Sequence, residues 1–112
     1  MVSPTGTFLF GAKMTEQEYE NAVKDKNVVV QFSANWCGPC KTVTPILENL
    51  TSQLDVDYLK VDISDSAELA KKLKIRSIPH VLFVKNGLVK EELVGARSSD
   101  HFLKLLKENY NS

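Results

Sequence analysis

The pattern of apolar and polar residues divides the chain into alternating strands and helices. Five segments have strand-like composition: residues 8–10, 28–34, 56–63, 80–85 and 88–94. The segment at 28–34 is rich in β-branched and aromatic residues with little polar alternation, which is typical of a strand covered on both faces. Asn86-Gly87 separates the last two segments and predicts a tight two-residue hairpin turn, so these two strands should be antiparallel.

Four other segments repeat apolar side chains at helical spacing: residues 15–24, residues 37–53, a short stretch that follows 65, and 98 or 99 to 109. Thr15 with Glu18, and Asp65 with Glu68, have the spacing of capping boxes at two of these helix starts. The order of elements predicts an α/β fold, with a central mixed β-sheet of four to five strands flanked by helices on both faces.

Composition and charge exclude several classes of function. The chain has 112 residues, 43% of them hydrophobic, which predicts one domain over residues 1–112 with residues 1–7 as a flexible tail. Fourteen basic residues balance fourteen acidic ones without long blocks of one sign, so we expect no nucleic-acid or membrane partner. Residues 1–14 resemble neither a secretory signal nor a transit peptide, and a cytoplasmic location is therefore expected.

The two cysteines of the chain lie in one tetrapeptide, Cys37-Gly38-Pro39-Cys40, between a buried strand and a helix. Unpaired backbone N–H groups and the positive end of the helix dipole lower the pKa of a thiol at Cys37 and favour its thiolate. Cys40 follows by three residues, so its sulfur returns over the first helical turn toward Cys37. Gly38 keeps the sulfur accessible, and Pro39 fits a helix start.

This tetrapeptide predicts a thiol–disulfide oxidoreductase. Cys37 would attack a substrate disulfide, and Cys40 would resolve the mixed disulfide that forms. The pair itself is the redox centre, so no cofactor is expected. A zinc site is the alternative for such a motif, but zinc needs four ligands and only His80 and His101 could complete them. Their spacing does not match a zinc finger, and we expect no metal.

Several motifs along the chain resemble the thioredoxin family. They are Trp36-Cys37-Gly38-Pro39-Cys40-Lys41, Pro45 eight residues after Cys37, Ile78-Pro79, Lys85-Asn86-Gly87 and Val94-Gly95-Ala96. The resemblance extends from about residue 15 to residue 110. It implies a thioredoxin fold and a monomeric protein-disulfide reductase. It also implies a thioredoxin reductase as electron donor, and target disulfides in proteins such as peroxiredoxins or ribonucleotide reductases.

The resemblance also implies a substrate surface around the cysteines. Pro79 would follow a cis peptide bond and lie across from Cys37, where its backbone edge would pair with the substrate peptide. The residues expected at this surface are Trp36, Ile63, Ile78, Pro79 and Gly95. Trp36, Gly38 and Pro39 would support the cysteines directly. Trp36 alone could equally be a core residue, because its indole is mostly apolar.

Three positions depart from the pattern of the family: Gln31, His80 and Ser33, the last where bacterial members often carry a second Trp and others carry Ser. Gln31 stands where an Asp is usually buried beneath the cysteines, and this Asp is thought to relay the proton of the resolving cysteine. Gln cannot ionise, so another group or water must take that role. Lys60 matches a position near this Asp and would lack a carboxylate partner. His80 replaces the usual Thr after the proline, and we form the hypothesis that it partly supplies the missing acid–base group.

Gln31 leaves two alternatives to a general disulfide reductase. One is a specialised thioredoxin-like protein with a narrow target range or a slowed resolving step. The other is a binding or chaperone module that uses the substrate surface without turnover. The presence of both Cys37 and Cys40 argues against the second.

Overall fold

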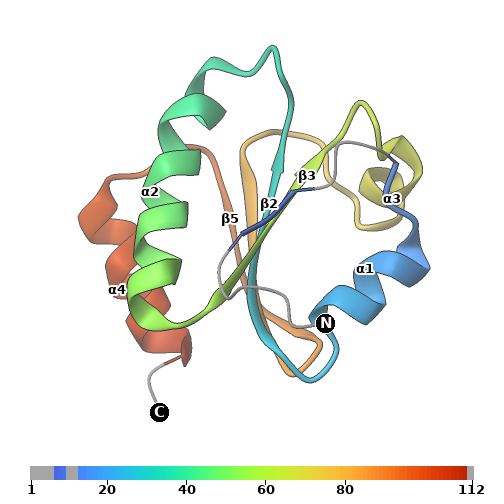
Figure 1. Ribbon diagram of the computed structural model, residues 1–112. Coiled ribbons are helices and arrows are strands. Elements are labelled where there is room, and N and C mark those ends of the chain that lie inside the picture. The colour runs from blue at the N-terminus through green and yellow to red at the C-terminus, as the bar shows by residue number, and fades with distance from the viewer. Residues whose placement is uncertain (1–6, 10–12, 111–112) are drawn as a thin grey trace.

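The computed structural model describes residues 7–9 and 13–110 (Figure 1). Strands and helices follow in the order β1 (Thr7–Leu9), α1 (Glu16–Val23), β2 (Asn27–Ser33), α2 (Gly38–Leu54), β3 (Asp57–Asp62), α3 (Ala67–Lys72), β4 (His80–Lys85), β5 (Leu88–Val94) and α4 (Ser99–Tyr110). This is the predicted order. Thr7, predicted in the tail, belongs to β1, whereas Phe10 and residues 1–6 lie outside the described residues.

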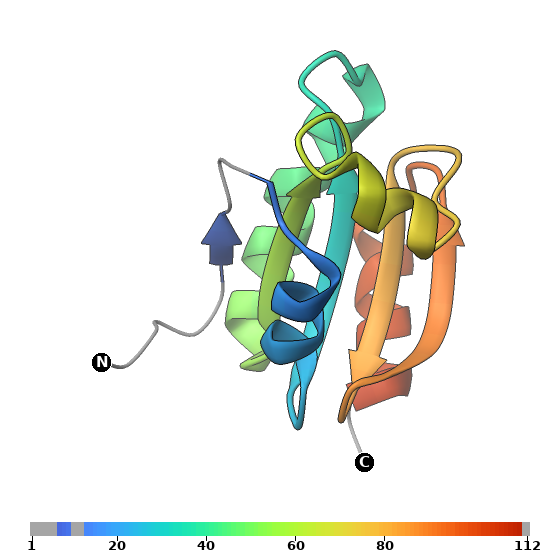
Figure 2. The same cartoon turned by 90° about the vertical axis from the view of Figure 1, so that its right-hand side faces the viewer.

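The strands form one mixed sheet of five strands in the order β1-β3-β2-β4-β5 (Figure 2). β1, β3 and β2 are parallel to one another, and β4 is antiparallel to both β2 and β5. The ends of β2, β3 and β5 therefore meet the start of β4 at one edge of the sheet. In α/β sheets, the edge where parallel strands end is the usual location of a functional site.

Helices cover both faces of the sheet, with α1 and α3 on one side and α2 and α4 on the other (Figure 1). Because strand side chains alternate between faces, Val30 and Phe32 of β2 join the core under α1 and α3, whereas Val29 joins the core under α2 and α4. All three are fully buried. Burial of each such side chain stabilises the fold by about 1.5–3 kcal/mol.

Three of the predicted local signals are confirmed. The Thr15 hydroxyl accepts from the backbone N–H of Glu18 at 3.1 Å, and the Glu18 carboxylate accepts from the N–H of Thr15 at 2.8 Å. At α4 the Ser98 hydroxyl accepts from the N–H of His101 at 3.2 Å. In the hairpin, Asn86 and Gly87 have φ values of 54° and 82°. Both residues therefore have the positive φ that a type I′ turn requires.

The predicted capping box of Asp65 and Glu68 is wrong. The N-cap of α3 is Ser66, whose hydroxyl instead accepts from the backbone N–H of Met14 at 2.8 Å. The carboxylate of Asp62 holds the preceding turn by accepting from the N–H of Asp65 at 3.3 Å. Asp65 is thus fixed outside the helix start. Long-range contacts of this kind override the local spacing rule.

Candidate active site

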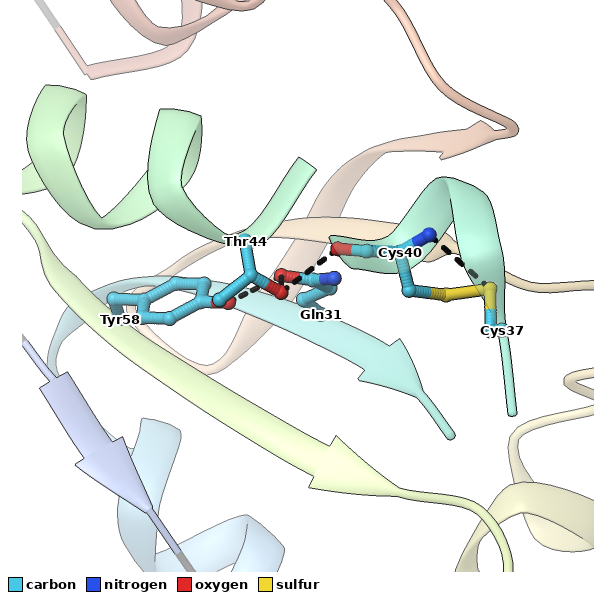
Figure 3. Close-up of a disulfide and its surroundings, with 5 residues drawn as sticks. All are labelled: Gln31, Cys37, Cys40, Thr44 and Tyr58. Atoms are coloured by element: carbon cyan, nitrogen blue, oxygen red, sulfur yellow. Dashed lines mark hydrogen bonds between the residues drawn. A yellow bond between two sulfur atoms is a disulfide. The ribbon is translucent and has the colours of Figure 1, made fainter. Parts of the chain in front are cut away.

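The two cysteines form a disulfide at the start of α2, beyond the end of β2 (Figure 3). Their Cα atoms are 5.4 Å apart, which is in the normal range for a disulfide. Cys37 is the N-cap residue, and its sulfur accepts from the backbone N–H of Cys40 at 3.2 Å. This N–H would stabilise a thiolate at the same place, which is the environment predicted for Cys37.

Both cysteines of the disulfide are buried. Cys37 is 4% exposed and Cys40 is 1% exposed, so Cys37 has more contact with solvent. Apart from its chain neighbours and the backbone of its own helix, no atom lies within 4 Å of where a Cβ of Gly38 would be. Pro39 occupies the first turn of α2, where its missing N–H removes no helical hydrogen bond. The structure therefore places both linking residues as expected.

Two of the five residues expected to bind substrate contact the cysteines in the structure, and a third, Pro79, is buried next to one of them. Ile63 and Ile78 are half-buried and pack against the cluster of Ala34 and the two cysteines. Trp36 is 70% exposed, so it is a surface residue and the core alternative is wrong. We call Trp36, Ile63, Ile78, Pro79 and Gly95 the disulfide surface.

The peptide bond between Ile78 and Pro79 is cis, as the family resemblance implies. The backbone N–H of Gly95 donates to the carbonyl of Pro79 at 2.8 Å, so the loop after β5 is tied to the start of β4. Gly95 has a φ of 98°, and a Cβ there would approach the guanidinium of Arg97 to 3.0 Å. The positive φ favours a glycine here, whereas the exposed Arg97 side chain could move away from a Cβ.

Beneath Cys40, a fully buried Gln31 lies within hydrogen-bond distance of two hydroxyl groups (Figure 3). The Tyr58 hydroxyl donates to Gln31 Oε1. The Thr44 hydroxyl lies 3.3 Å from the same oxygen and 3.0 Å from the carbonyl of Cys40, and its single proton can go to either. Gln31 Nε2 points toward the side of Cys40 and has no hydrogen-bond partner among the described residues.

The network around Gln31 is neutral. Burial raises the pKa of Tyr58 well above its ordinary value of 10.0, so its hydroxyl stays protonated and can donate. The hydrogen bond with Thr44 lowers this pKa, but burial is the larger effect. Neither Thr44 nor Gln31 ionises in the accessible pH range. No side chain of this network can take a proton as a buried carboxylate would.

Lys60 lies beside Gln31 in the parallel pairing of β2 and β3. It borders a hollow of about 270 Å³, whose walls also include Cys40, Lys41 and Thr44. Lys60 is thus next to position 31, as expected. The hollow adjoins Cys40, which is itself buried.

His80 does not belong to this network. It pairs with Phe32, not with Gln31, and the one-residue offset turns its side chain to the face of α1 and α3. There His80 Nε2 is 2.8 Å from the carboxylate of Glu92, and Nδ1 is buried without a partner in the described chain. The hypothesis that His80 supplies the missing acid–base group near Gln31 is therefore wrong on geometry.

Two members of this network, Thr44 and Tyr58, were not among the predicted site residues. Tyr58 is two residues before Lys60 on β3, so period-two alternation places it on the face of Gln31. Thr44 is four residues after Cys40 on α2, which is one helical turn. Both signals are present in the sequence, but only the strand register shows that they converge.

Within residues 7–9 and 13–110, no three His, Cys, Asp or Glu side chains cluster in a way that could hold a metal ion. In the same residues, no helix has the length and apolar character that crossing a bilayer requires.

Comparisons with known proteins agree with this geometry. The family model described as Thioredoxin matches residues 11–108. A thioredoxin from Chlamydia trachomatis is 35% identical over 97 residues, which cover 86% of this chain and 95% of that protein. Thioredoxin-1 from Saccharomyces cerevisiae is 38% identical over 84 residues, covering 73% and 82%. The chain belongs to the thioredoxin family.

The crystal structure of a thioredoxin from Nicotiana alata has the same architecture, with a TM-score of 0.81 at 29% identity over 97% of this chain and 96% of that one. The chain thus has the thioredoxin fold, as predicted. Its family and the Cys37–Cys40 disulfide make it a thiol–disulfide oxidoreductase. Within this thioredoxin, the neutral network of Gln31, Tyr58 and Thr44 is the feature that the motif alone does not predict.

Proposed function

We propose that this thioredoxin reduces protein disulfides, with Cys37 as the nucleophile and Cys40 as the resolving thiol. The observation that carries the assignment is the position of the Cys37 sulfur at the N-cap of α2. There it accepts the N–H of Cys40, and Cys37 is slightly less buried than Cys40, at 4% against 1% exposed. A thiolate at this position is both stabilised and reachable by a substrate.

The reaction moves two electrons from the cysteines to the substrate. In the reduced protein, the Cys37 thiolate attacks one sulfur of the substrate disulfide and expels the other as a thiolate. Cys40 then loses its proton and attacks the Cys37 sulfur of the mixed disulfide. The substrate leaves as a dithiol, and the Cys37–Cys40 disulfide seen in the structure is the oxidised product.

Gln31 favours a resolving step without a buried acid–base residue. The proton of Cys40 leaves through the hollow that Cys40, Thr44 and Lys60 border, where water can accept it. The ammonium group of Lys60 favours the Cys40 thiolate that remains. Transfer to water lacks the positioned base that normally accelerates such a step, so this step is slower than in relatives with a carboxylate. This is the specialised alternative that Gln31 suggested.

The disulfide surface binds the substrate chain. Its half-buried isoleucines Ile63 and Ile78 offer apolar contact beside Cys37, and Trp36 extends this contact outward. The electron donor is a thioredoxin reductase, and the targets are proteins with disulfides of the peroxiredoxin or ribonucleotide reductase type. We propose a cytoplasmic monomer as the working form.

Trapping of the mixed disulfide tests the assignment of the two cysteines. Reduced Cys40→Ser and Cys37→Ser variants are mixed with a disulfide-bonded protein, and the adducts are identified by mass spectrometry. Cys40→Ser should accumulate a substrate adduct on Cys37, because nothing resolves it. Cys37→Ser should form little adduct, because Cys40 lies inside the first turn of α2 and lacks the N-cap position that stabilises a thiolate.

The double variant Cys37→Ser/Cys40→Ser is the control for non-covalent capture. Equal trapping by both single variants would show that the two thiols are interchangeable and would overturn the assignment. For the resolving step, the decay of the mixed disulfide is followed in a single turnover of the parent protein. Decay faster than attack at every pH would argue against a slowed step.

A further inference from the structure

A second hollow, with a basic rim, adjoins the disulfide surface. Its volume is about 340 Å³. The apolar part of its lining consists of Ile63, Ala67, Ala70 and Ile75. The exposed side chains of Lys71, Lys74 and Arg76 complete the lining. Because Ile63 also packs against the cysteines, the hollow is continuous with the surface on which a substrate would lie. We call these seven residues the basic hollow.

The cations of the basic hollow are available to a ligand. Neighbouring charges form ion pairs, such as Lys72 with Glu16 at 3.4 Å. In the part of the chain that the structure describes, Lys71, Lys74 and Arg76 form none. Unpaired cations can attract the carboxylate of an acidic side chain. The apolar part of the lining can contact the methylene groups of that side chain or an aliphatic residue next to it.

The backbone of Lys74 provides independent support. α3 ends in a Schellman motif, in which Lys74 N–H donates to the carbonyl of Lys71 at 3.1 Å and Ile75 N–H donates to that of Ala70 at 2.8 Å. Lys74 has a φ of 61°, at the position where glycine is usual.

The identity of this residue is unusual for its conformation. In the described ranges, the other non-glycine residues with positive φ are Asp25, Asp55 and Asn86, which are of the types that tolerate it best. Lys74 therefore has a strained backbone conformation, and strained residues of this kind are concentrated at functional sites.

We propose that the basic hollow binds an acidic side chain of the protein substrate, close in sequence to its reactive disulfide. The proposal rests on the proposed function, because it extends the same substrate surface. A chain paired with the backbone at Ile78 and Pro79 continues past Arg76 toward Lys74. Since an extended chain advances about 3.3 Å per residue, an acidic residue a few positions from the substrate cysteine reaches the hollow. Substrates with acidic segments beside their disulfides are therefore preferred.

Two disulfide-bonded peptides test the preference. They are identical except that one carries Asp and Glu next to a cysteine and the other carries Asn and Gln. The kcat/KM for reduction of each is measured at low and at high salt. The acidic peptide should react about three- to tenfold better at low salt, the size expected for one or two exposed charge pairs. The preference should shrink at high salt, because exposed charges are screened.

A double variant, Lys74→Gly/Arg76→Gln, assigns the preference to the hollow. Its ratio of kcat/KM for the two peptides should fall toward one. Lys74→Gly also relieves the strained φ, so the Tm of that single variant should stay equal or rise, which separates loss of charge from loss of fold. Lys104→Gln, which removes an exposed cation on α4 at the opposite face of the sheet, is the matched control and should keep the parent ratio.

A parent ratio near one, or a ratio that survives in the double variant, would overturn the basic hollow as a binding site. Either result leaves the proposed function intact. Failure of the parent protein to reduce both peptides would instead contradict the proposed function itself.

Discussion

Gln31 and His80 are two buried polar residues on neighbouring strands, yet they belong to different halves of the molecule. Gln31 faces α2 and lies under the disulfide, whereas His80 faces α1 and α3. The cause is the register: Gln31 pairs with Val81, and His80 pairs with Phe32. One residue of offset in a strand reverses the face. Two positions that seem coupled in the sequence can thus be separated by the whole thickness of a sheet.

The surroundings of the two residues differ as well. Gln31 is fully buried and has neutral partners, the hydroxyls of Tyr58 and Thr44. His80 contacts Glu92, a carboxylate whose side chain is 55% exposed. The disulfide side therefore contains a polar network without charge, and the far side contains a titratable pair near solvent. Proton exchange at Cys40 is consequently separated from the only buried histidine of the described chain.

The largest expected effect comes from Gln31→Asp. A buried carboxylate loses hydration, so the pKa of the introduced Asp is raised in the folded state. Stability is then lost as the pH rises above the unfolded pKa of about 4. We expect the free energy of unfolding to fall by roughly 2–4 kcal/mol at pH 8, and by less at pH 5. Urea unfolding of the parent and the variant at both pH values measures this loss of stability.

Gln31→Asn is the matched control for Gln31→Asp, because Asn has nearly the same shape as Asp and cannot ionise. The difference between the two variants should be largest at pH 8 and nearly vanish at pH 4. An Asp variant as stable as the Asn variant at pH 8 would mean that position 31 is hydrated, and the description of a closed neutral network would be wrong.

Tyr58→Phe should have a smaller effect on the same network. It removes one of the two hydroxyl donors to Gln31 Oε1 and leaves the ring packing in place. We expect a loss of about 1–2 kcal/mol in the free energy of unfolding at pH 7. Tyr19→Phe is the control, because no hydrogen bond of its hydroxyl is present among the described residues, and it should change stability by less than about 0.5 kcal/mol.

Alkaline pH distinguishes these tyrosines further. Burial raises the pKa of Tyr19 to about 12, and the nearby carboxylates of Glu92 and Glu20 add to this effect. Burial raises that of Tyr58 further. A tyrosine whose pKa is higher in the folded than in the unfolded protein favours folding fully at pH values below the unfolded pKa of about 10. This contribution to the free energy of unfolding is lost as the pH rises through the pKa of the folded protein. Between pH 10 and 12, the parent protein should lose stability more steeply than Tyr58→Phe.

The smallest effect is expected from His80→Gln. Because His80 is on the face opposite Gln31, the pH dependence of disulfide reduction should keep the shape of the parent profile. Loss of the contact with the half-exposed Glu92 should cost at most about 1 kcal/mol. Reduction rates measured from pH 6 to pH 9 decide the matter. A limb of the profile that disappears in His80→Gln would restore the discarded role of this histidine.

Much of the fold was predictable, because its elements have strong local signals. The hairpin of β4 and β5 has its predicted bounds, since Asn86-Gly87 supplies both positive φ values. The start of α1 was equally clear from Thr15 and Glu18. The start of α3 was not, because the hydroxyl of Ser66 binds Met14, which is 52 residues away in the sequence. Contacts at such a separation leave no local pattern.

The active site also combines features with a local sequence signal and features that depend on distant residues. The roles expected of Cys37 and Cys40 depend on three-residue spacing at a helix start, and the structure brings the two together as that spacing requires. The contacts of Gln31 with Tyr58 and Thr44 depend on the parallel register of β2 and β3 and on the packing of α2 against them. The wrong assignment of His80 has the same cause, because one residue of register was undetermined.

The central claim is that the start of α2 stabilises a thiolate at Cys37. Its most direct test is the pH dependence of alkylation at Cys37 in the reduced Cys40→Ser variant, where Cys37 is the sole thiol. The midpoint should lie well below the value of about 8.5 that is typical of an unperturbed cysteine. A midpoint at or above that value would contradict the account.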